Sequence, residues 1–160
     1  MKSARPATSR DLDRLGELYL MMGREYAQLD PAYALAIDAG RMWREHLLEG
    51  LKRDRIRVPV TVDEGGRPVS FLIARVAPSP PGSANPQVGL IEGAYVEEGF
   101  RRQGRLRAMA DDAMRWFAVK RMPHVDLIAD TRDPVALAAW RALGFGDLQL
   151  VLRARVPPSE

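Results

Sequence analysis

Apolar side chains recur every three to four residues in four stretches of the chain, and this spacing predicts amphipathic helices. The four stretches are residues 11–26, 40–53, 104–120 and 134–143. Thr8 and Asp11 are spaced as in a capping box at the start of the first helix. Asp133 and Pro134 favour the start of the last helix, and Gly144 suits the left-handed residue that follows its end.

Short runs of β-branched and other apolar residues predict strands between these helices. They are residues 57–62, 69–76, 88–96, 125–129 and 148–156, and residues 2–7 are a candidate for a first strand. The turn residues at 63–68 predict a hairpin of the first two. The proline-rich stretch 77–87 is either a domain linker or a long loop, and the loop is favoured because neither half would bury a sufficient core alone.

This order of elements predicts the α/β class, with a mixed sheet and helices on its faces. A chain of 160 residues is long enough for one domain with a proper core. We expect that domain to cover residues 1–156, followed by a flexible C-terminal tail at 157–160.

Composition excludes several kinds of site. The chain has no cysteine, which removes disulfides and thiolate metal sites, and its two histidines are too few for a histidine-rich metal site. A net charge of +3 is too small to indicate nucleic-acid binding by itself. No apolar run approaches 18 residues and the N-terminal residues do not resemble a signal peptide, so we expect no membrane association and a cytoplasmic location.

The richest stretch for chemistry is residues 91–107, where a predicted strand is followed by a short polar turn and a helix opening at Gly104. Four arginines crowd this opening, namely Arg101, Arg102, Arg105 and Arg107. A helix N-terminus offers free N–H groups and arginines match phosphate oxygens, so this layout favours an anion. The alternatives are a solvated helix start and a nucleic-acid contact.

At this point the sequence resembles the GNAT superfamily of acyl-CoA-dependent N-acyltransferases. Arg101-x-x-Gly104-x-Leu106 is similar to the family's pyrophosphate loop, (Arg/Gln)-x-x-Gly-x-(Gly/Ala). The stretch from Asp133 through Ala136 and Trp140 to Gly144-Phe145 is similar to its second signature, Asn-x-x-Ala-x-x-x-Tyr-x-x-x-Gly-Phe. The resemblance implies a mostly antiparallel sheet with a splayed parallel strand pair.

The resemblance also implies where acetyl-CoA binds. The pantetheine arm would lie in the splayed gap against Ala94, Tyr95 and Val96, and the Val96 N–H would stabilise the oxyanion. Gly93 is a candidate for a bulge that helps the splay. The expected cofactor-binding set also includes Arg101, Arg102, Gln103, Gly104, Arg105, Leu106, Arg107, Asp133, Ala136 and Trp140.

Glu92 is the candidate base. In a regular strand residues 92, 94 and 96 share a face, so its carboxylate is expected on the same side as Val96. The order Glu92-x-x-Tyr95-Val96 resembles the diamine and polyamine acetyltransferase branch, in which such a glutamate deprotonates the amine. The alternative is a surface glutamate paired with an arginine.

Three residues depart from the family pattern. Trp140 stands where a tyrosine usually protonates the leaving thiolate, Leu106 replaces Gly or Ala, and Asp133 replaces Asn. The resemblance implies an acetyltransferase that uses acetyl-CoA, a small-molecule or peptide amine and no metal, and that forms a homodimer. The departures motivate the alternative of a non-catalytic module that binds CoA or another phosphate ligand.

Overall fold

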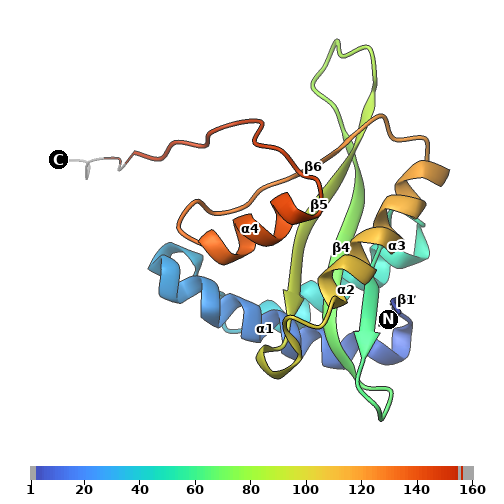
Figure 1. Cartoon of the computed structure of the whole chain (residues 1–160), viewed down its shortest axis with the longest axis vertical. Helices are drawn as coiled ribbons and strands as arrows, with labels where there is room; N and C mark the ends of the chain where they lie inside the picture. The colour runs from blue at the N-terminus through green and yellow to red at the C-terminus, as the bar shows by residue number, and fades with distance from the viewer. Residues whose placement is uncertain (1–2, 155, 157–160) are drawn as a thin grey trace.

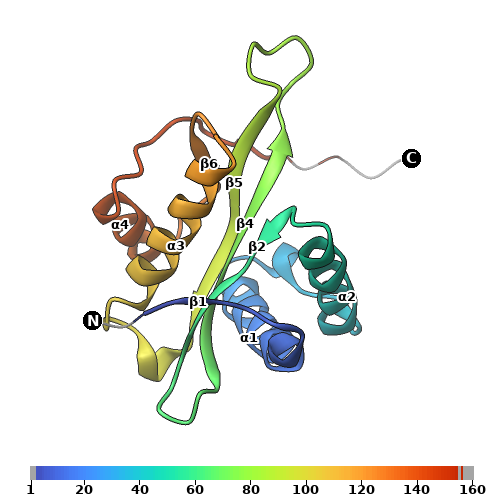
Figure 2. The ribbon, with the colours of Figure 1, turned by 90° about the vertical axis from the view of Figure 1, so that its right-hand side faces the viewer.

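The computed structural model describes residues 3–154 and residue 156. A central sheet has α1 and α2 on one face and α3 and α4 on the other (Figures 1 and 2). The helices are α1 (Leu12–Leu29), α2 (Ala39–Lys52), α3 (Arg105–Val119) and α4 (Pro134–Ala142), with short 3-10 helices η1 (Ser9–Asp11), η2 (Pro31–Tyr33) and η3 (Glu98–Phe100). The strands are β1 (Arg5–Pro6), β2 (Ile56–Arg57), β3 (Pro59–Val62), β4 (Pro68–Pro78), β5 (Gln87–Val96) and β6 (Val125–Leu127).

The sheet runs in the order β1-β3-β4-β5-β6, and β2 pairs separately with β4. Every pair is antiparallel except β5 and β6, which are parallel. The predicted hairpin is confirmed, with Val60 opposite Phe71, and the proline-rich stretch is a loop between β4 and β5. The expected α/β class with a mostly antiparallel mixed sheet is therefore confirmed.

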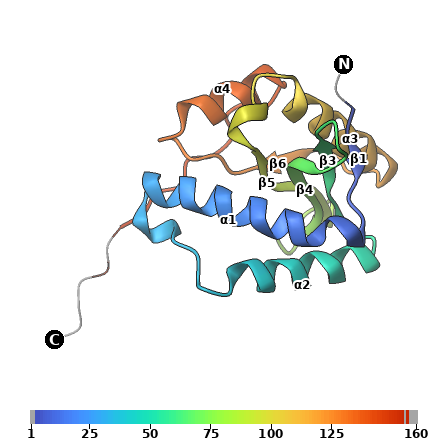
Figure 3. The same cartoon turned by 90° about the horizontal axis from the view of Figure 1, so that it is seen from below.

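Two apolar clusters hold the layers together, one on each face of the sheet. Helices α1 and α2 pack side by side on the first face, where Phe71 and Tyr95 belong to the cluster (Figure 3). On the second face, Leu72 and Ile91 pack with Met109 of α3. Because neighbouring strand residues alternate between these clusters, the register of β4 and β5 decides which side chains face each layer.

The start of α1 is fixed by Asp11. Its carboxylate accepts hydrogen bonds from the Thr8 backbone N–H at 2.7 Å and from the Arg5 guanidinium at 2.8 and 2.9 Å. The Arg5 hydrogen bond, opposed by burial and reinforced by Thr8, lowers the pKa of Asp11 to about 2. The ion pair joins the first strand to the first helix, and the Asp11 side chain is only 8% exposed.

We expect Asp11→Asn to lower the free energy of unfolding at pH 7 by about 2 kcal/mol, the equivalent of the pKa shift. A carboxylate whose pKa is depressed by folding stabilises the protein above its unfolded pKa of about 3.9, and this contribution is lost as the pH falls toward about 2. Urea denaturation at several pH values measures it. Asp13→Asn, which removes an exposed partner of Arg44, is the matched control. If the difference in unfolding free energy between wild type and Asp11→Asn does not change with pH, the ionised Asp11 carboxylate is not its source.

The predicted strand at 148–156 is wrong over the residues described, because the chain pairs with no strand there (Figure 1). Its side chains explain why. Leu148, Leu150 and Leu152 are 73%, 72% and 83% exposed, and the intervening Val151 is 75% exposed, so neither face of the segment is buried. Strand β6 is also shorter than predicted and ends at Leu127. The expected tail at 157–160 and Lys2 of the candidate first strand lie outside the described residues.

Candidate active site

Strands β5 and β6 run side by side for three residue pairs and then part. The last pair joins Ile91 to Leu127, where β6 ends, whereas β5 continues to Val96. Residues 92–96 therefore have a strand partner on the β4 side only. We call the unpaired edge at residues 92–96, together with residues 128–132 that follow β6, the opening.

The direction of the backbone N–H groups along β5 follows from the register. The Glu97 N–H donates to the Val69 carbonyl oxygen at 3.0 Å, and antiparallel residues alternate between facing the partner strand and facing away. Tyr95 and Gly93 therefore point their N–H groups at β4. The N–H groups of Val96 and Ala94 point the other way, toward the opening.

A β-bulge at Glu92 corrects the expected alternation of side chains. Ile73 pairs with Gly93 but Ala74 pairs with Ile91, which leaves Glu92 as the extra residue of β5. Ala94 packs in the α3–α4 cluster, whereas Glu92 forms an ion pair with Arg75. The predicted bulge is confirmed, and it moves the carboxylate of Glu92 off the face shared by residues 94 and 96.

Arg75 shows on which side the Glu92 carboxylate lies. Arg75 comes two residues after Ile73, whose side chain packs in the α1–α2 cluster, so Arg75 starts from the same face of β4. Its guanidinium donates from Nε to Glu92 Oε1, and the Glu92 side chain is 28% exposed. Glu92 is therefore a partly solvated carboxylate at the vertex of the opening, directed toward the α1–α2 side.

The turn after β5 presents a run of free backbone donors. The N–H groups of residues 102–107 donate to no protein acceptor in the described part of the chain, and the first bond of α3 comes from Ala108 to Gly104. Arg102 and Gly104 have left-handed backbones, with φ of 60° and 74°. Such alternation turns successive N–H groups toward one concave surface, which suits a polyanion.

The arginine side chains of this turn differ in the groups to which they donate hydrogen bonds. The Arg105 guanidinium is buried and donates to the Thr61 hydroxyl and the Val62 carbonyl oxygen, both at 2.9 Å. Arg107 donates to the Ala142 carbonyl oxygen at 3.1 Å. The exposed Gln103 side chain donates to the Gly99 carbonyl oxygen of η3 at 3.4 Å. Among the arginines of this turn, Arg102 alone makes no hydrogen bond or ion pair with its side chain in the described residues, so anion binding here would depend mainly on the backbone.

Leu106 is the large residue at a position where the resembling motif has Gly or Ala. It is partly buried and packs against the apolar cluster on the α3 face of the sheet.

Arg101 holds the turn to α1. Its Nη2 donates to both Glu25 carboxylate oxygens, at 2.7 and 2.8 Å, and its Nε donates to the Val96 carbonyl oxygen at 2.8 Å. The Tyr95 hydroxyl donates to the same Glu25 at 2.8 Å, and burial together with this hydrogen bond raises the pKa of Tyr95 to about 12. We call Glu25, Tyr95 and Arg101 the clamp, since they fix the peptide that follows Val96.

Glu25→Gln is expected to lower the pKa of Tyr95 toward its ordinary value, because the anionic acceptor is lost. A spectrophotometric titration of the tyrosines measures this shift. We also expect about three- to tenfold weaker binding of the CoA that the resemblance implies at this turn, the cost of one charge-assisted hydrogen bond. Glu49→Gln, which removes an exposed partner of Arg53, is the matched control. Unchanged titration and binding would show that the clamp does not position this turn.

The second candidate motif forms the start and core face of α4. Asp133 caps the helix, accepting from the Ala136 N–H at 2.9 Å. Trp140 is 9% exposed and lies edge-to-face against Phe145, with ring centroids 5.4 Å apart. Asp133 thus stabilises the helix and Trp140 packs in the core, and Ala136 packs partly buried against the same cluster.

Comparison with protein families identifies one match. The model of the acetyltransferase (GNAT) family matches residues 20–145, most of the chain. The chain belongs to the GNAT acetyltransferase family. A comparison with curated proteins finds no match.

Several solved structures share the fold at low sequence identity. A mutant of the BH1408 protein from Bacillus halodurans superposes with a TM-score of 0.82 at 14% identity, over 96% of this chain and 99% of that one. A GCN5-related N-acetyltransferase from Ralstonia eutropha gives 0.77 at 20%, over 97% and 99%. The aminoglycoside N-acetyltransferase AAC(6')-Iy in complex with CoA gives 0.75 at 20%, over 98% and 95%.

The C-terminal end of α1 bridges the opening of this GNAT chain. Glu25 contacts Arg101 after β5, and five residues later Asp30 contacts Arg132 in the segment that follows β6. At 1.5 Å per helical residue these contacts are about 7.5 Å apart along the helix. Between them, burial and the Asp133 carboxylate raise the pKa of Tyr26. Helix α1 therefore closes one side of the opening.

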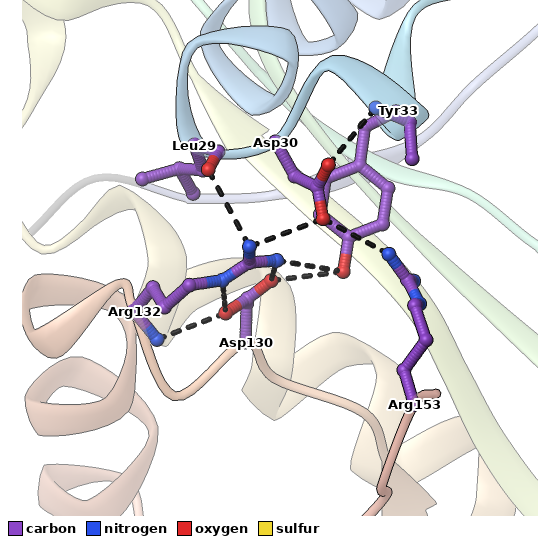
Figure 4. Close-up of polar contacts among 7 residues, drawn as sticks. Leu29, Asp30, Tyr33, Asp130, Arg132 and Arg153 are labelled. Atoms are coloured by element: carbon purple, nitrogen blue, oxygen red, sulfur yellow. Dashed lines mark hydrogen bonds and ion pairs between the residues drawn. The ribbon is translucent and has the colours of Figure 1, made fainter. Parts of the chain in front are cut away.

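A dense polar group lies where α1 and η2 meet the segment after β6 (Figure 4). The Tyr33 hydroxyl donates to Asp130 at 2.8 Å, and Arg132 donates to Asp130 and to Asp30. Hydrogen bonds from Arg132, opposed by burial and joined by Tyr33, lower the pKa of Asp130. We call Asp30, Tyr33, Asp130 and Arg132 the cradle.

Sequence reasoning missed the clamp partner Glu25, the Glu92 partner Arg75 and the whole cradle. No spacing rule could have joined them, because Tyr33 and Asp130 are 97 residues apart and Glu25 and Arg101 are 76 apart. Tyr33 meets Asp130, and Glu25 meets Arg101, because α1 and η2 pack over the sheet, whereas Arg75 meets Glu92 through the pairing of β4 with β5.

Residues 3–154 and 156 were compared with the requirements of a metal site and of a membrane-spanning helix, and they meet neither. No three metal-ligating side chains come together there. None of the helices in the same residues has the length and apolar character needed to span a bilayer.

Proposed function

We propose that this chain transfers an acetyl group from acetyl-CoA to a primary amine by direct attack within a ternary complex. The amine nitrogen forms a bond to the carbonyl carbon, the carbon–sulfur bond breaks, and CoA leaves as the thiolate. The substrate nitrogen gives up two protons, one from the ammonium form before it attacks and one as the amide forms; the thiolate takes up one proton, and one is released in net. GNAT membership and the CoA complex of the similar aminoglycoside acetyltransferase support the donor.

The observation that carries the proposal is the parting of β5 and β6 beyond Ile91 and Leu127. The N–H groups of Ala94 and Val96 point into the space so created, as required for binding an extended amide-containing arm. The Val96 N–H would stabilise the carbonyl oxygen as it gains charge, a contribution typically worth about 10²–10³ in rate. The free N–H groups of residues 102–107 would hold the pyrophosphate.

Glu92 is the proposed base. A primary alkylamine has a pKa near 10.4 and must lose a proton before it attacks. The bulge places the Glu92 carboxylate toward α1 and α2, so we propose that the amine approaches from that side and that the acetyl donor lies within the opening. The Glu92 carboxylate, which accepts a hydrogen bond from Arg75 Nε, would take the proton directly or through water.

We propose that no side chain at position 140 protonates the leaving group. Trp140 has only an indole N–H, which is a donor and not an acid near neutral pH, and it is packed against Phe145. A free thiol has a pKa near 8.5, so water can protonate the thiolate at a useful rate.

Thermal shift with CoA and acetyl-CoA, followed by thiol-release assays over a panel of amines, tests the function. Acetyl-CoA should raise the melting temperature by mass action, since it binds only the folded chain. Thiol release that depends on an added amine is the expected result. Absence of both the shift and the release would overturn the proposal.

The second candidate function is a non-catalytic module that binds CoA. It is favoured by the engagement of Glu92 with Arg75 and by the packed Trp140. A thermal shift without thiol release, for every amine tested, would establish this alternative instead.

We also propose that residues 1–156 act as one domain and that the chain forms a homodimer. The exposed apolar residues of the C-terminal segment and the free edge of β6 support association. Light scattering at micromolar concentration should give twice the monomer mass of 17.9 kDa. A monomer at that concentration would overturn the dimer.

A further inference from the structure

A pocket lies on the α3 side of the sheet, beside the outer edge of β6. Its volume is about 390 Å³, and it is formed by α3, β6 and the residues after α4. Apolar residues line it, among them Met114 and Phe145, together with the three aspartates Asp111, Asp126 and Asp147. We call it the edge pocket, because β6 pairs with β5 alone in the part of the chain that the structure describes, which leaves its other edge open.

The C-terminal segment matches this pocket in chemistry. Its side chains Leu150, Val151 and Leu152 are 72%, 75% and 83% exposed. Residues 148–156 contain two arginines and no acidic residue, so the segment is apolar and basic where the pocket is apolar and acidic. Clustered exposed apolar side chains mark an interaction surface, and an open strand edge can accept an added extended segment.

The chain's own segment runs away from the edge pocket. Leu148 is the last residue that lines the pocket. Five residues later Arg153 donates to Asp30 at 2.9 Å, and its guanidinium carbon lies 5.6 Å from the centre of the Tyr33 ring (Figure 4). Asp30 follows α1, which covers the face of the sheet opposite α3 (Figure 2). The segment is therefore anchored on the α1 side, and its leucines lie outside the pocket of its own chain.

We propose that residues 148–152 of one copy dock in the edge pocket of a second copy, along the outer edge of its β6, and that the second copy does the same in return. Each chain carries one pocket and one matching segment, so a twofold dimer buries both kinds of surface at once. The contact of Arg153 with Asp30 holds the preceding leucines away from their own pocket and leaves them available to the partner. This inference rests on the proposed homodimer and is independent of the proposed acetyl transfer.

Thiol cross-linking tests the contact, because the chain has no cysteine of its own. Leu150→Cys is prepared in one sample and Met114→Cys in another, and the two are mixed and treated with a short bismaleimide, which joins neighbouring thiols. We expect a covalent dimer that contains one chain of each kind, with residues 114 and 150 linked. In a mixture of single variants such a link forms only between copies.

Met42→Cys is the matched control for Met114→Cys. Met42 is 55% exposed and Met114 is 46% exposed, but Met42 lies on α2, on the opposite face of the sheet (Figure 2). Mixed with Leu150→Cys, it should give only a background yield of covalent dimer. Equal yields from the two mixtures would overturn the proposal. A link formed only within single chains of the variant Leu150→Cys/Met114→Cys would also overturn it, because the chain's own segment would then fill the pocket.

Sedimentation velocity over a range of concentrations tests the energetic role of the segment. We expect Leu150→Glu to raise the dissociation constant of the dimer by about 10²-fold, since burial of one leucine is worth about tenfold and a twofold dimer contains the contact twice. Leu150 is exposed, so this substitution removes no packing within the chain. Ile37→Glu places the same charge at a fully exposed residue between η2 and α2 and should leave the dissociation constant unchanged.

The outcomes separate this inference from the rest of the proposed function. A wild-type dimer that Leu150→Glu leaves intact would overturn the docking site and leave the homodimer standing. A wild-type chain that stays monomeric would overturn both. Neither measurement involves acetyl-CoA or an amine, so thiol release decides the proposed acetyl transfer independently.

Discussion

Glu92→Gln is expected to lower kcat for amine acetylation at pH 7 by about 10²- to 10⁴-fold, the usual contribution of a positioned base. Glutamine keeps the size of the side chain and can still accept from Arg75, but it cannot take a proton. The KM for acetyl-CoA should change little, because Glu92 lies on the acceptor side of the sheet. Initial rates at saturating acetyl-CoA measure the effect.

The pH dependence of Glu92→Gln distinguishes a base from a structural residue. Above its pKa of about 10.4 most of the amine is already neutral, so the variant should recover much of the wild-type rate. Glu45→Gln removes an exposed glutamate paired with Arg41 and controls for loss of surface charge. If Glu92→Gln retains the wild-type kcat at pH 7, or if its defect is the same at every pH, Glu92 is not the base.

Val96→Pro is expected to lower kcat by about 10²- to 10³-fold, since proline removes the N–H that we propose stabilises the oxyanion. This N–H faces the opening and not β4, so the substitution removes no bond of the β4–β5 ladder. CoA binding should persist, because residues 102–107 keep their donors. Single-turnover rates and CoA titration separate the two effects.

Val96→Ala is the matched control, because it shortens the side chain and leaves the N–H in place. We expect its kcat to stay within a few fold of wild type, and the melting temperature of both variants shows whether β5 is intact. Equal rates for Val96→Pro and Val96→Ala would contradict an oxyanion role for this backbone.

The elements with strong periodicity were predictable from sequence. The α1 pattern, the capping residues Asp11 and Asp133 and the turn before β4 act over a few residues, so local chemistry decides them. The glycine turn was recognisable as a resemblance, because its backbone donors depend on the left-handed conformation at Gly104.

The remaining features depend on contacts that no local pattern encodes. Gly93 indicated a bulge, but the face taken by Glu92 follows from its register with β4 and from Arg75. Residues 148–156 have the alternation of a strand, yet the sheet edge next to them, β6, is only three residues long and ends at Leu127. The arginines predicted as phosphate ligands turned out partly committed elsewhere, as Arg105 shows, because buried carbonyl oxygens of β3 also need donors.

Because the end of α1 bridges the opening, donor binding and acceptor preference would depend on different parts of the sequence. In the proposed function β5 and the turn that follows would bind the thioester, whereas residues 25–33, which contact both Arg101 and the segment after β6, would line the acceptor entrance. Exchange of that short segment with a GNAT relative should therefore carry over amine preference and leave donor affinity unchanged. Substrate choice in such a chain can evolve within two helical turns.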